Sequence, residues 1–400
     1  MKSSFKKVLV ASILFAGVLA GCSGGKNSSG GNSSGGSDDK GDTIKIGANL
    51  ELSGEVASYG QSISEGMELA IEEINDGGGV DGKKIEVVKV DNKSDNAEAA
   101  SAATRLTSQE NVLAIIGAAT SGNTIAQAQI ANDTQTILLS PSGTAPNVTE
   151  NEDGSINEYV FRTSYIDPFQ GTVAANFAAN ELGVKTAAIY SDSASDYAKG
   201  LAAAFKETFE AAGGSIVAEE SYVAGDTDFR STLTRIKSAN PEFVFVPGYY
   251  EEVGLIVKQA RESGVTVPLM GADGWDSPTL IELAGKDALN NTFITNHYSS
   301  QDPDDKIQEF VTKFKEKYND KSPDAFNALG YDSIYLLADA IKRAGSLDHE
   351  AVKDALAETK DISLVTGVIT IDEKHNPIKS ATILEYVDGE QHFKAKIDPE

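Results

Sequence analysis

Hydrophobic residues along this chain follow two alternating patterns, short apolar runs typical of buried strands and three-to-four-residue spacings typical of helices. The run at 44–48 predicts a strand. Apolar residues at 63, 67, 70, 71 and 74 predict a helix behind a Ser62-x-x-Glu65 capping box, ended by the glycines at 77–79. Further strands are predicted at 85–90, 112–117 and 136–139, and further helices at 97–109 and 122–133. This order predicts a parallel βαβ series.

The same alternation repeats in the middle of the chain. Helices are predicted at 169–181, 197–211, 228–239 and 251–263, and strands at 186–190, 215–222, 242–246 and 267–270. The fold class is therefore α/β, with two doubly wound parallel-sheet halves. Later helices near 306–318, 326–344 and 349–358, with short strands from Val365, do not form a third unit of this kind. We expect them to return and complete the first two halves.

The first 42 residues have a different pattern. Lys2, Lys6 and Lys7 precede a 13-residue apolar run at 8–20, which suits an export signal and is too short to span a membrane. The run ends in Leu-Ala-Gly-Cys22, which resembles the bacterial lipobox, so residues 1–21 are predicted as a lipoprotein signal peptide and Cys22 as the lipidated residue. A buried thiol is the alternative. Residues 22–42 are predicted to be a tether, because 13 of the 19 residues at 23–41 are Gly or Ser.

Charge and cysteine usage narrow the class of protein. The chain has 60 acidic and 34 basic residues, a formal net charge of −26, which disfavours nucleic acid as a partner. Cys22 is the only cysteine, so no disulfide can stabilise the body. Two domains are expected over 43–400, because that length exceeds one ordinary core.

Ligands of open parallel sheets bind at the carboxyl ends of strands, so the loops after the strands are the candidate site. The loop containing Ser121 leads into a helix whose amides and dipole favour an anion. The loop containing Ser142 and Thr144 offers small residues and hydroxyl donors. Alternatively, Ser121 is only an N-cap and Ser142 belongs only to a turn. The pairing of two such loops favours an anion site.

A carboxylate and several aromatic residues follow other strands. Asp273 lies after the strand at 267–270, where it could meet an ammonium group, although Asp before Gly is also a common turn. Tyr59, Tyr197 and Tyr249 are candidate pocket walls, and Trp275 either lines the same pocket or packs in a core.

An enzyme is the rival class. The segment 77–82 fits G-x-G-x-x-G, but it follows a helix and precedes a strand, the reverse of a dinucleotide site. No G-x-S-x-G motif occurs, and the four histidines are scattered without metal spacing: His297, His349, His375 and His392. We therefore expect no catalysis, no cofactor and no metal.

At these residues the chain resembles the leucine/isoleucine/valine-binding proteins, type I extracellular solute-binding proteins of ABC importers. The resemblance covers nearly the whole body and rests on a set of short motifs: Leu52-Ser53-Gly54, Tyr59-Gly60, Gly79-Val80-Asp81-Gly82-Lys83, Ser140-Pro141-Ser142-Gly143-Thr144, Arg162-Thr163, Gly200-Leu201-Ala202, Gly248-Tyr249 and Gly271-Ala272-Asp273-Gly274. The chain departs from the family pattern at three positions. Alanine is usual in place of Ser142, glutamate is usual in place of Asp273, and a tryptophan is not usual at the position of Trp275. These departures leave open which ligand side chain the site prefers.

The resemblance implies a site. Ser121 and Thr144 would hold the carboxylate of an amino acid, the Ser142 carbonyl and Asp273 would hold its ammonium, and Tyr59, Tyr197 and Tyr249 would line the cleft. Two lobes joined by three crossings are implied, with residues 43–163 and 297–380 forming one lobe and residues 164–296 and 381–400 the other. The lobes would close over the ligand.

The resemblance also implies partners and a location. We expect a monomer that captures an amino acid, with branched aliphatic side chains as the family default, and delivers it to an ABC permease. It would be exported and anchored by Cys22 to the outer face of the cytoplasmic membrane, at the cell surface or in the periplasm. A sensor that presents its ligand to a membrane receptor is the alternative, because the binding chemistry would be the same.

Overall fold

The computed structural model describes residues 43–151 and 153–399. The described residues belong to one unit, Gly41–Glu400, and all that follows concerns it. The predicted signal peptide, Cys22 and the tether lie outside the described residues. Within the described part, none of the helices combines the length and the apolar character needed to cross a membrane.

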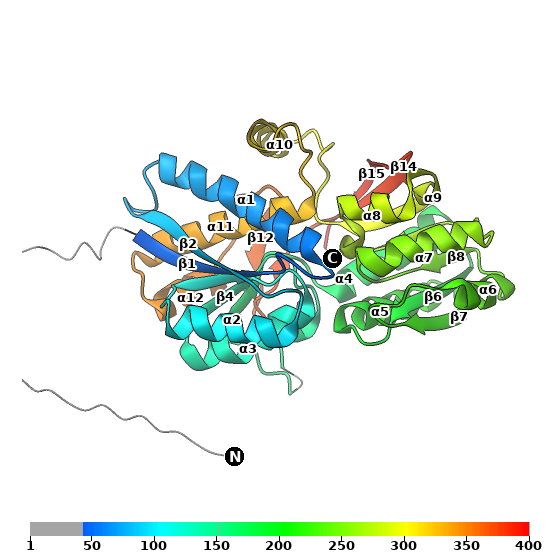
Figure 1. Cartoon of the computed structure of the whole chain (residues 1–400), viewed down its shortest axis with the longest axis horizontal. Helices are drawn as coiled ribbons and strands as arrows, with labels where there is room; N and C mark the ends of the chain where they lie inside the picture. The colour runs from blue at the N-terminus through cyan, green and yellow to red at the C-terminus, as the bar shows by residue number, and fades with distance from the viewer. Residues whose placement is uncertain (1–42, 152, 400) are drawn as a thin grey trace, which may run out of the picture. The chain divides into compact units, whose positions relative to one another are not determined.

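The first half of the unit is built on a five-stranded parallel sheet (Figure 1). Its strand order is β2-β1-β3-β4-β5. The strands are β1 (Thr43–Leu50), β2 (Lys84–Asp91), β3 (Ala114–Gly117), β4 (Ile137–Ser140) and β5 (Val160–Arg162). The helices between them are α1 (Ala57–Asp76), α2 (Asn96–Ser108) and α3 (Ser121–Thr134), followed by a short turn, η1 (Pro146–Val148).

A seven-stranded sheet forms the second half, in the order β15-β14-β10-β9-β8-β6-β7. Its parallel strands are β6 (Thr186–Asp192), β7 (Ser215–Tyr222), β8 (Phe243–Phe245), β9 (Leu269–Gly271) and β10 (Thr292–Asn296). Two further strands, β14 (Ala381–Val387) and β15 (Glu390–Ile397), pair antiparallel at the edge next to β10. Its helical segments are α4 (Asp167–Asn176), η2 (Phe177–Glu181), α5 (Asp196–Ala211), α6 (Arg230–Ser238), α7 (Tyr250–Glu262), η3 (Asp273–Trp275), α8 (Pro278–Ala284) and α9 (Lys286–Leu289).

The inner strands of both sheets are covered on both faces, which explains why they read as continuous apolar runs. In β8, Phe243 and Phe245 belong to the core beneath α4 and α5, whereas Val244 packs on the opposite face with the residues of α7 and α8. Because successive strand side chains point to opposite faces, one apolar run supplies two layers of core. The predicted α/β architecture is confirmed, with a parallel sheet in each half, to which β14 and β15 add two antiparallel strands in the second.

The late segments of the chain join the two halves that precede them. They are α10 (Asp305–Lys317), α11 (Ala325–Ala344), α12 (His349–Ala357) and a small sheet of β11 (Ile362–Leu364), β12 (Gly367–Ile371) and β13 (Pro377–Ile378). Helix α11 lies directly against α1: a Cβ at Gly66 would come within 1.9 Å of the Asn327 carbonyl, and one at Gly330 within 2.3 Å of the Ile63 carbonyl. Only glycine permits this backbone approach.

Several sequence predictions about elements were wrong. Helix α1 begins at Ala57, so Ser62 and Glu65 do not form a capping box. Both side chains contact the segment that leads into α11. The Ser62 hydroxyl donates to Asp324 Oδ2 at 2.7 Å, and Glu65 forms an ion pair with Lys321 at 2.6 Å. Strands β5 and β10 were not predicted, because each is short and its polar residues are buried through contacts with distant segments.

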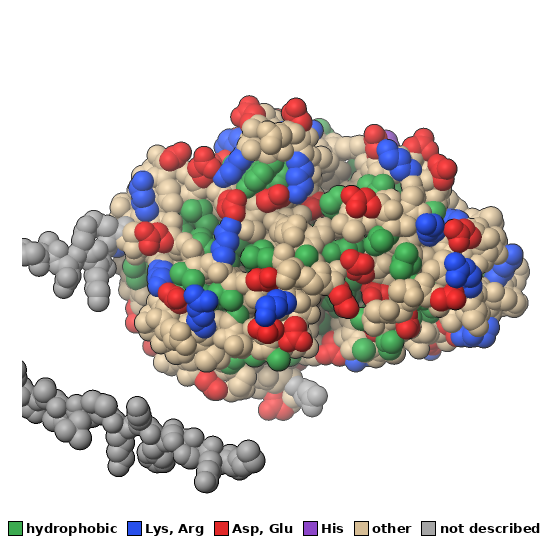
Figure 2. All heavy atoms as spheres, in the orientation of Figure 1, with side chains coloured by type: hydrophobic (Ala, Val, Ile, Leu, Met, Phe, Trp, Pro, Cys, Tyr) green, Lys and Arg blue, Asp and Glu red, His purple; other side chains and the backbone are tan. Residues whose placement is uncertain are grey.

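The surface of the described unit is strongly charged but mixed. Acidic and basic side chains are interspersed over the face drawn in Figure 2, with small apolar areas between them. On this face the acidic residues therefore occupy many separate positions rather than one block.

Candidate functional site

A small cavity lies where the loops of the two sheets meet. The loops that follow β3 and β4 supply one side, and η3, the first turn of α5 and the residue before α7 supply the other. The lining residues are Tyr59, Ala119, Thr120, Ser121, Ser142, Tyr197, Tyr249, Asp273, Gly274 and Phe326. The site thus forms at the carboxyl ends of parallel strands, as expected for open α/β sheets.

Six of the eight predicted ligand-binding residues are among these lining residues: Tyr59, Ser121, Ser142, Tyr197, Tyr249 and Asp273. Thr144 and Trp275 are not among them. Thr144 is buried with its hydroxyl free of hydrogen bonds within the described protein. Trp275 is fully buried, packs against Gly271, and donates its indole N–H to the Val246 carbonyl at 2.9 Å.

The loop after β3 is organised by Glu51, which sequence reasoning missed. Its carboxylate accepts from the Ala119 amide at 2.9 Å, from the Thr120 amide and hydroxyl at 3.0 Å, and from Asn123 Nδ2 at 2.9 Å. Two of the amides that we expected to bind an anion are therefore occupied by this fully buried acid. Glu51 follows β1 directly, so the search of strand ends could have included it.

The two hydroxyl loops are joined to each other. The Ser142 hydroxyl donates to the Ala119 carbonyl at 2.7 Å, and the Ser121 hydroxyl accepts from the Ala145 amide at 3.0 Å. The N-cap of α3 is Thr120, whose hydroxyl accepts from the Asn123 amide, so the alternative that Ser121 is an N-cap was wrong. Ser121 is the first residue of α3, where the helix dipole favours negative charge.

Asp273 is held by four donors on the opposite side. Its Oδ1 accepts from the Tyr197 hydroxyl at 2.8 Å, from Gln170 Nε2 at 3.1 Å and from the Gly274 amide at 3.1 Å, and its Oδ2 lies 3.1 Å from His297 Nε2. Burial lowers the pKa of His297 to about 4 despite the adjacent carboxylate. His297 is therefore neutral at pH 7 and does not balance the charge of Asp273.

This lack of a cation is the main electrostatic feature of the site. Among the described residues, neither Lys nor Arg forms an ion pair with Asp273. Its carboxylate is buried, and dipoles rather than a full positive charge surround it. Such a group favours a ligand that carries its own cation.

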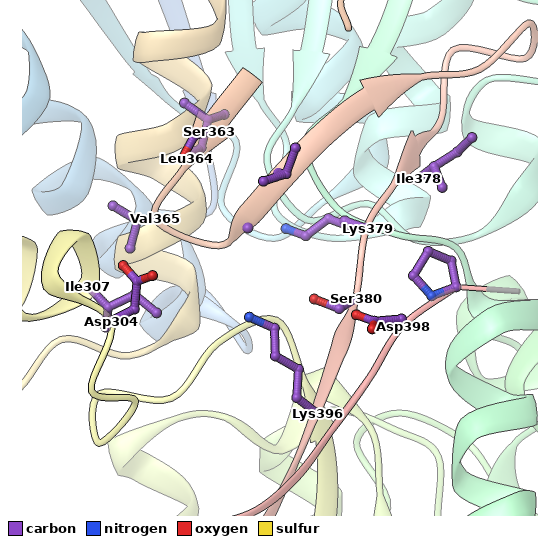
Figure 3. A pocket seen from close by; sticks show the side chains of 13 residues that line it. Asp304, Ile307, Ser363, Leu364, Val365, Ile378, Lys379, Ser380, Lys396 and Asp398 are labelled. Atoms are coloured by element: carbon purple, nitrogen blue, oxygen red, sulfur yellow. The ribbon is translucent and has the colours of Figure 1, made fainter. Parts of the chain in front are cut away.

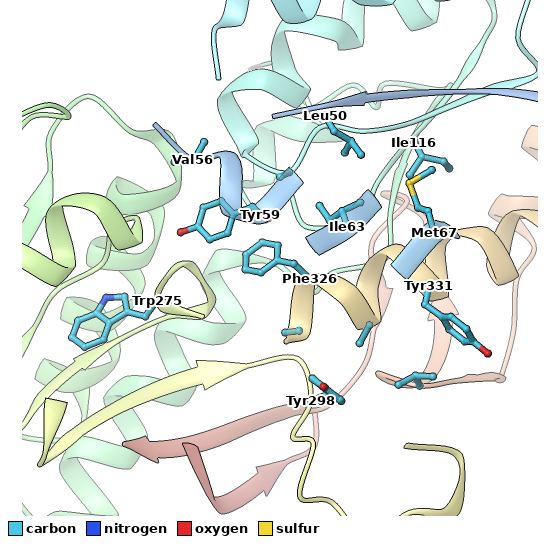
Figure 4. Close-up of a cluster of buried hydrophobic side chains, with 14 of the residues drawn as sticks. Leu50, Val56, Tyr59, Ile63, Met67, Ile116, Trp275, Tyr298, Phe326 and Tyr331 are labelled. Carbon is cyan, nitrogen blue, oxygen red and sulfur yellow. The ribbon is translucent and has the colours of Figure 1, made fainter. Parts of the chain in front are cut away.

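Aromatic rings form the walls. Tyr197 and Tyr249 are stacked at 5.1 Å, and Tyr59 stacks on Phe326 at 4.3 Å (Figure 4). Burial raises the pKa of Tyr59, Tyr197 and Tyr249, so all three remain phenols. Sequence reasoning missed Phe326, because it lies far along the chain and reaches the cavity only through the contact of α11 with α1.

Direct contacts connect the two sides of the cavity. The Tyr59 hydroxyl donates to the Gly274 carbonyl and accepts from the Tyr250 amide at 3.2 Å. The Ser58 and Ser277 hydroxyls are 2.8 Å apart. The first turn of α1 thus contacts both η3 and the start of α7.

A different hollow lies near β12, β13 and β15 (Figure 3). Lys379 and Lys396 enter it together with Asp304 and Asp398. The Lys379 ammonium already donates to the Thr366 hydroxyl and to the Thr163 carbonyl. Within the described residues, no cluster of three or more His, Cys, Asp or Glu is placed to hold a metal ion. The first cavity is therefore the candidate site.

Comparisons with known proteins show the family of this chain. The chain is 32% identical to the leucine-, isoleucine-, valine-, threonine- and alanine-binding protein of Pseudomonas aeruginosa over 83% of this chain and 87% of that protein. The crystal structure of the branched-chain amino acid transporter substrate-binding protein LivJ of Streptococcus pneumoniae, in complex with isoleucine, is 40% identical, with a TM-score of 0.84, over 90% of this chain and 100% of that one.

The leucine-binding protein LivK of Thermotoga maritima is 37% identical, with a TM-score of 0.84, over 89% of this chain and 99% of that structure. A model of the periplasmic binding protein family matches residues 43–391, which include every residue that lines the cavity and all strands of the two sheets except most of β15. The chain belongs to the periplasmic binding protein family.

Proposed function

We propose that this protein captures an α-amino acid with a branched aliphatic side chain and delivers it to an ABC permease. The observation that carries the proposal is the polarity of the cavity, which has hydroxyls at the start of α3 on one side and Asp273, without a cation, on the other. The names of LivJ and of the Pseudomonas aeruginosa protein support the same ligand class.

The proposed contacts follow from the two charges of the ligand. Ser121 and Thr144 would donate to its carboxylate, which the N-terminus of α3 favours. The Ser142 carbonyl and Asp273 would accept from its ammonium. Charge-assisted hydrogen bonds contribute about 1.5–3 kcal/mol each, so recognition of both charges supplies most of the binding energy of a small ligand.

The walls would select the side chain. Tyr59, Tyr249 and Phe326 present ring surfaces to the cavity. A compact branched aliphatic group gains from contact with these surfaces and needs no polar partner. Trp275, the last residue of η3, would act indirectly, through its packing against Gly271.

The cavity would form by closure of two lobes, residues 43–163 with 297–380 and residues 164–296 with 381–400. The contacts of Tyr59 with Gly274 and Tyr250, and of Ser58 with Ser277, support this proposal, because they join segments from the two sheets beside the cavity. Closure would bring Asp273, Tyr197 and Tyr249 over a ligand already held by Ser121 and Ser142.

A thermal-shift screen against the twenty amino acids tests the function. A ligand at 100 times its Kd stabilises the native state by about 2.7 kcal/mol, so leucine, isoleucine or valine is expected to raise the melting temperature visibly. The matched controls are their amides and the amines that lack the carboxylate. A shift with simple carboxylates but with none of the amino acids would contradict the proposal.

The family is one of exported solute-binding proteins, so the chain is exported and is not an enzyme.

We propose that Cys22 is lipidated after removal of residues 1–21 and anchors a monomer to the outer face of the cytoplasmic membrane. Replacing Cys22 by alanine is expected to move the protein from the membrane fraction to the soluble fraction. An unchanged distribution in fractionated cells would rule out this anchor.

A permease gene next to this one would favour transport over the sensor alternative.

A further inference from the structure

Two helices that begin beside the cavity have no side-chain cap of their own. The N-cap of α1 is Val56 and that of α7 is Tyr249, and neither side chain accepts a hydrogen bond from the first turn of its helix. The first amides of a helix have no partner within the helix, so they need an acceptor from elsewhere. In α3 the Thr120 hydroxyl takes this role. For α1 and α7, one such acceptor comes from the other helix.

These two acceptors are tyrosine hydroxyls. The Ser58 amide, in the first turn of α1, donates to the Tyr250 hydroxyl at 3.2 Å. The Tyr250 amide, at the start of α7, donates to the Tyr59 hydroxyl of α1 at 3.2 Å. Each hydroxyl also donates, that of Tyr250 to the Glu55 carbonyl at 3.0 Å and that of Tyr59 to the Gly274 carbonyl. We call these hydrogen bonds of the Tyr59 and Tyr250 hydroxyls the tyrosine latch.

The tyrosine latch joins the two sheets. Helix α1 follows β1 of the five-stranded sheet, whereas α7 follows β8 of the seven-stranded sheet. Both tyrosines are buried, and their rings pack edge to face with centroids 5.0 Å apart. Asn147 Nδ2 also donates across the sheets, to Asp196 Oδ2 at 2.9 Å, but these two side chains are exposed. Hydrogen bonds shielded from water are stronger, so we expect the tyrosine latch to contribute more than the exposed contact.

A phenol hydroxyl suits the junction of two helix N-termini. Both ends carry the positive pole of a helix dipole, so their approach is unfavourable unless an acceptor lies between them. Each phenol oxygen provides that acceptor and still donates its own proton to a carbonyl. Burial raises the pKa of Tyr250 to about 12 and raises that of Tyr59 as well. Both hydroxyls therefore keep their protons at neutral pH.

We propose that Tyr250, which does not line the cavity, is a positioning residue that holds the protein closed around its ligand. This inference rests on the proposed function. Tyr59 belongs both to the tyrosine latch and to the cavity wall, so ligand binding and latch formation favour each other. In the open form the same groups bond to water, and on closure they form the four hydrogen bonds between the sheets.

Tyr250→Phe tests the proposal, because it keeps the ring and removes only the hydroxyl. In calorimetric titration its affinity for L-isoleucine is expected to fall about tenfold, the equivalent of one net hydrogen bond. The ligand-free variant is expected to melt within about 2 °C of the wild-type protein, since the open form lacks the latch. Stopped-flow mixing, followed by the fluorescence of Trp275, the only tryptophan, should show faster dissociation and unchanged association.

Tyr318→Phe is the matched control. Its hydroxyl donates to the Glu65 carbonyl of α1 at 2.9 Å, but Tyr318 caps the end of α10 and does not reach the seven-stranded sheet through this bond. This variant should bind isoleucine as the wild type does.

Ser58→Ala is a second variant at the same junction. It removes the hydroxyl that lies 2.8 Å from the Ser277 hydroxyl, and alanine is well tolerated in a helix. Its affinity for isoleucine is expected to fall about threefold, because one partly exposed hydrogen bond is lost.

The results that overturn the inference differ from those that overturn the function. Wild-type affinity in Tyr250→Phe would overturn the tyrosine latch and leave the proposed function intact. So would a ligand-free Tyr250→Phe protein that loses as much melting temperature as its complex, because the hydroxyl would then serve the fold alone. Where Tyr250→Phe fails to fold, wild-type affinity in Ser58→Ala overturns the latch. Absence of binding of any amino acid by the wild-type protein would overturn both.

Discussion

Replacing Asp273 by alanine is expected to weaken amino-acid binding by roughly 2–5 kcal/mol, the usual cost of removing one partner of a buried charge pair. This corresponds to a loss of affinity between about thirtyfold and a few thousandfold. The reason is that no Lys or Arg among the described residues neutralises the carboxylate, so the ligand's ammonium is its only full positive partner in the cavity. Calorimetric titration with leucine or isoleucine measures the change.

Two further variants make the result specific. Asp273→Asn keeps the shape and can still accept from Tyr197, so a comparable loss in this variant isolates the charge. Asp287→Ala removes an exposed aspartate of α9 and should bind as the wild type does. An Asp273→Ala protein that melts normally and keeps wild-type affinity would show that Asp273 does not bind the ammonium.

The second large effect is expected for Glu51→Ala, which should lower the free energy of unfolding by about 3–5 kcal/mol. Its carboxylate is fully buried and accepts from the Ala119 amide, from the amide and hydroxyl of Thr120, and from Asn123 Nδ2. Alanine would leave these four donors buried without an acceptor. Urea unfolding of the ligand-free protein measures the loss.

Glu86→Ala is the control for this variant, because Glu86 is an exposed acid on the neighbouring strand β2. Its stability should differ from that of the wild-type protein by no more than about 0.5 kcal/mol. If Glu51→Ala unfolds at the same urea concentration as Glu86→Ala, Glu51 does not hold the loop after β3 in place.

The sequence was informative where local pattern determines structure. Strands buried on both faces appear as apolar runs, and helices between them as amphipathic spacings, so most elements were predicted within a few residues. The rule that ligands bind at strand ends then selected Ser121, Ser142 and Asp273, and all three line one cavity. These residues are near their strands in the sequence, so no knowledge of distant contacts was needed.

The residues that sequence reasoning missed depend on distant contacts. Glu51 receives its donors from residues 119–123, and Phe326 reaches the cavity on a helix that returns from late in the chain. The Ser62 motif failed as a capping box because α1 begins five residues earlier, and the Ser62 hydroxyl donates instead to Asp324 of another segment. The ligand-binding roles of all eight predicted residues and the bounds of the two lobes stay predictions.

The central claim is that the cavity binds an amino acid through both of its charges. Its most direct test is calorimetric titration of the purified protein with L-isoleucine, with isoleucinamide and with 2-methylbutylamine, which lacks the carboxylate. The account predicts saturable binding of isoleucine and a loss of at least about tenfold in affinity, or 1.4 kcal/mol, for each of the other two compounds. Equal affinity for isoleucine and either analogue would contradict it.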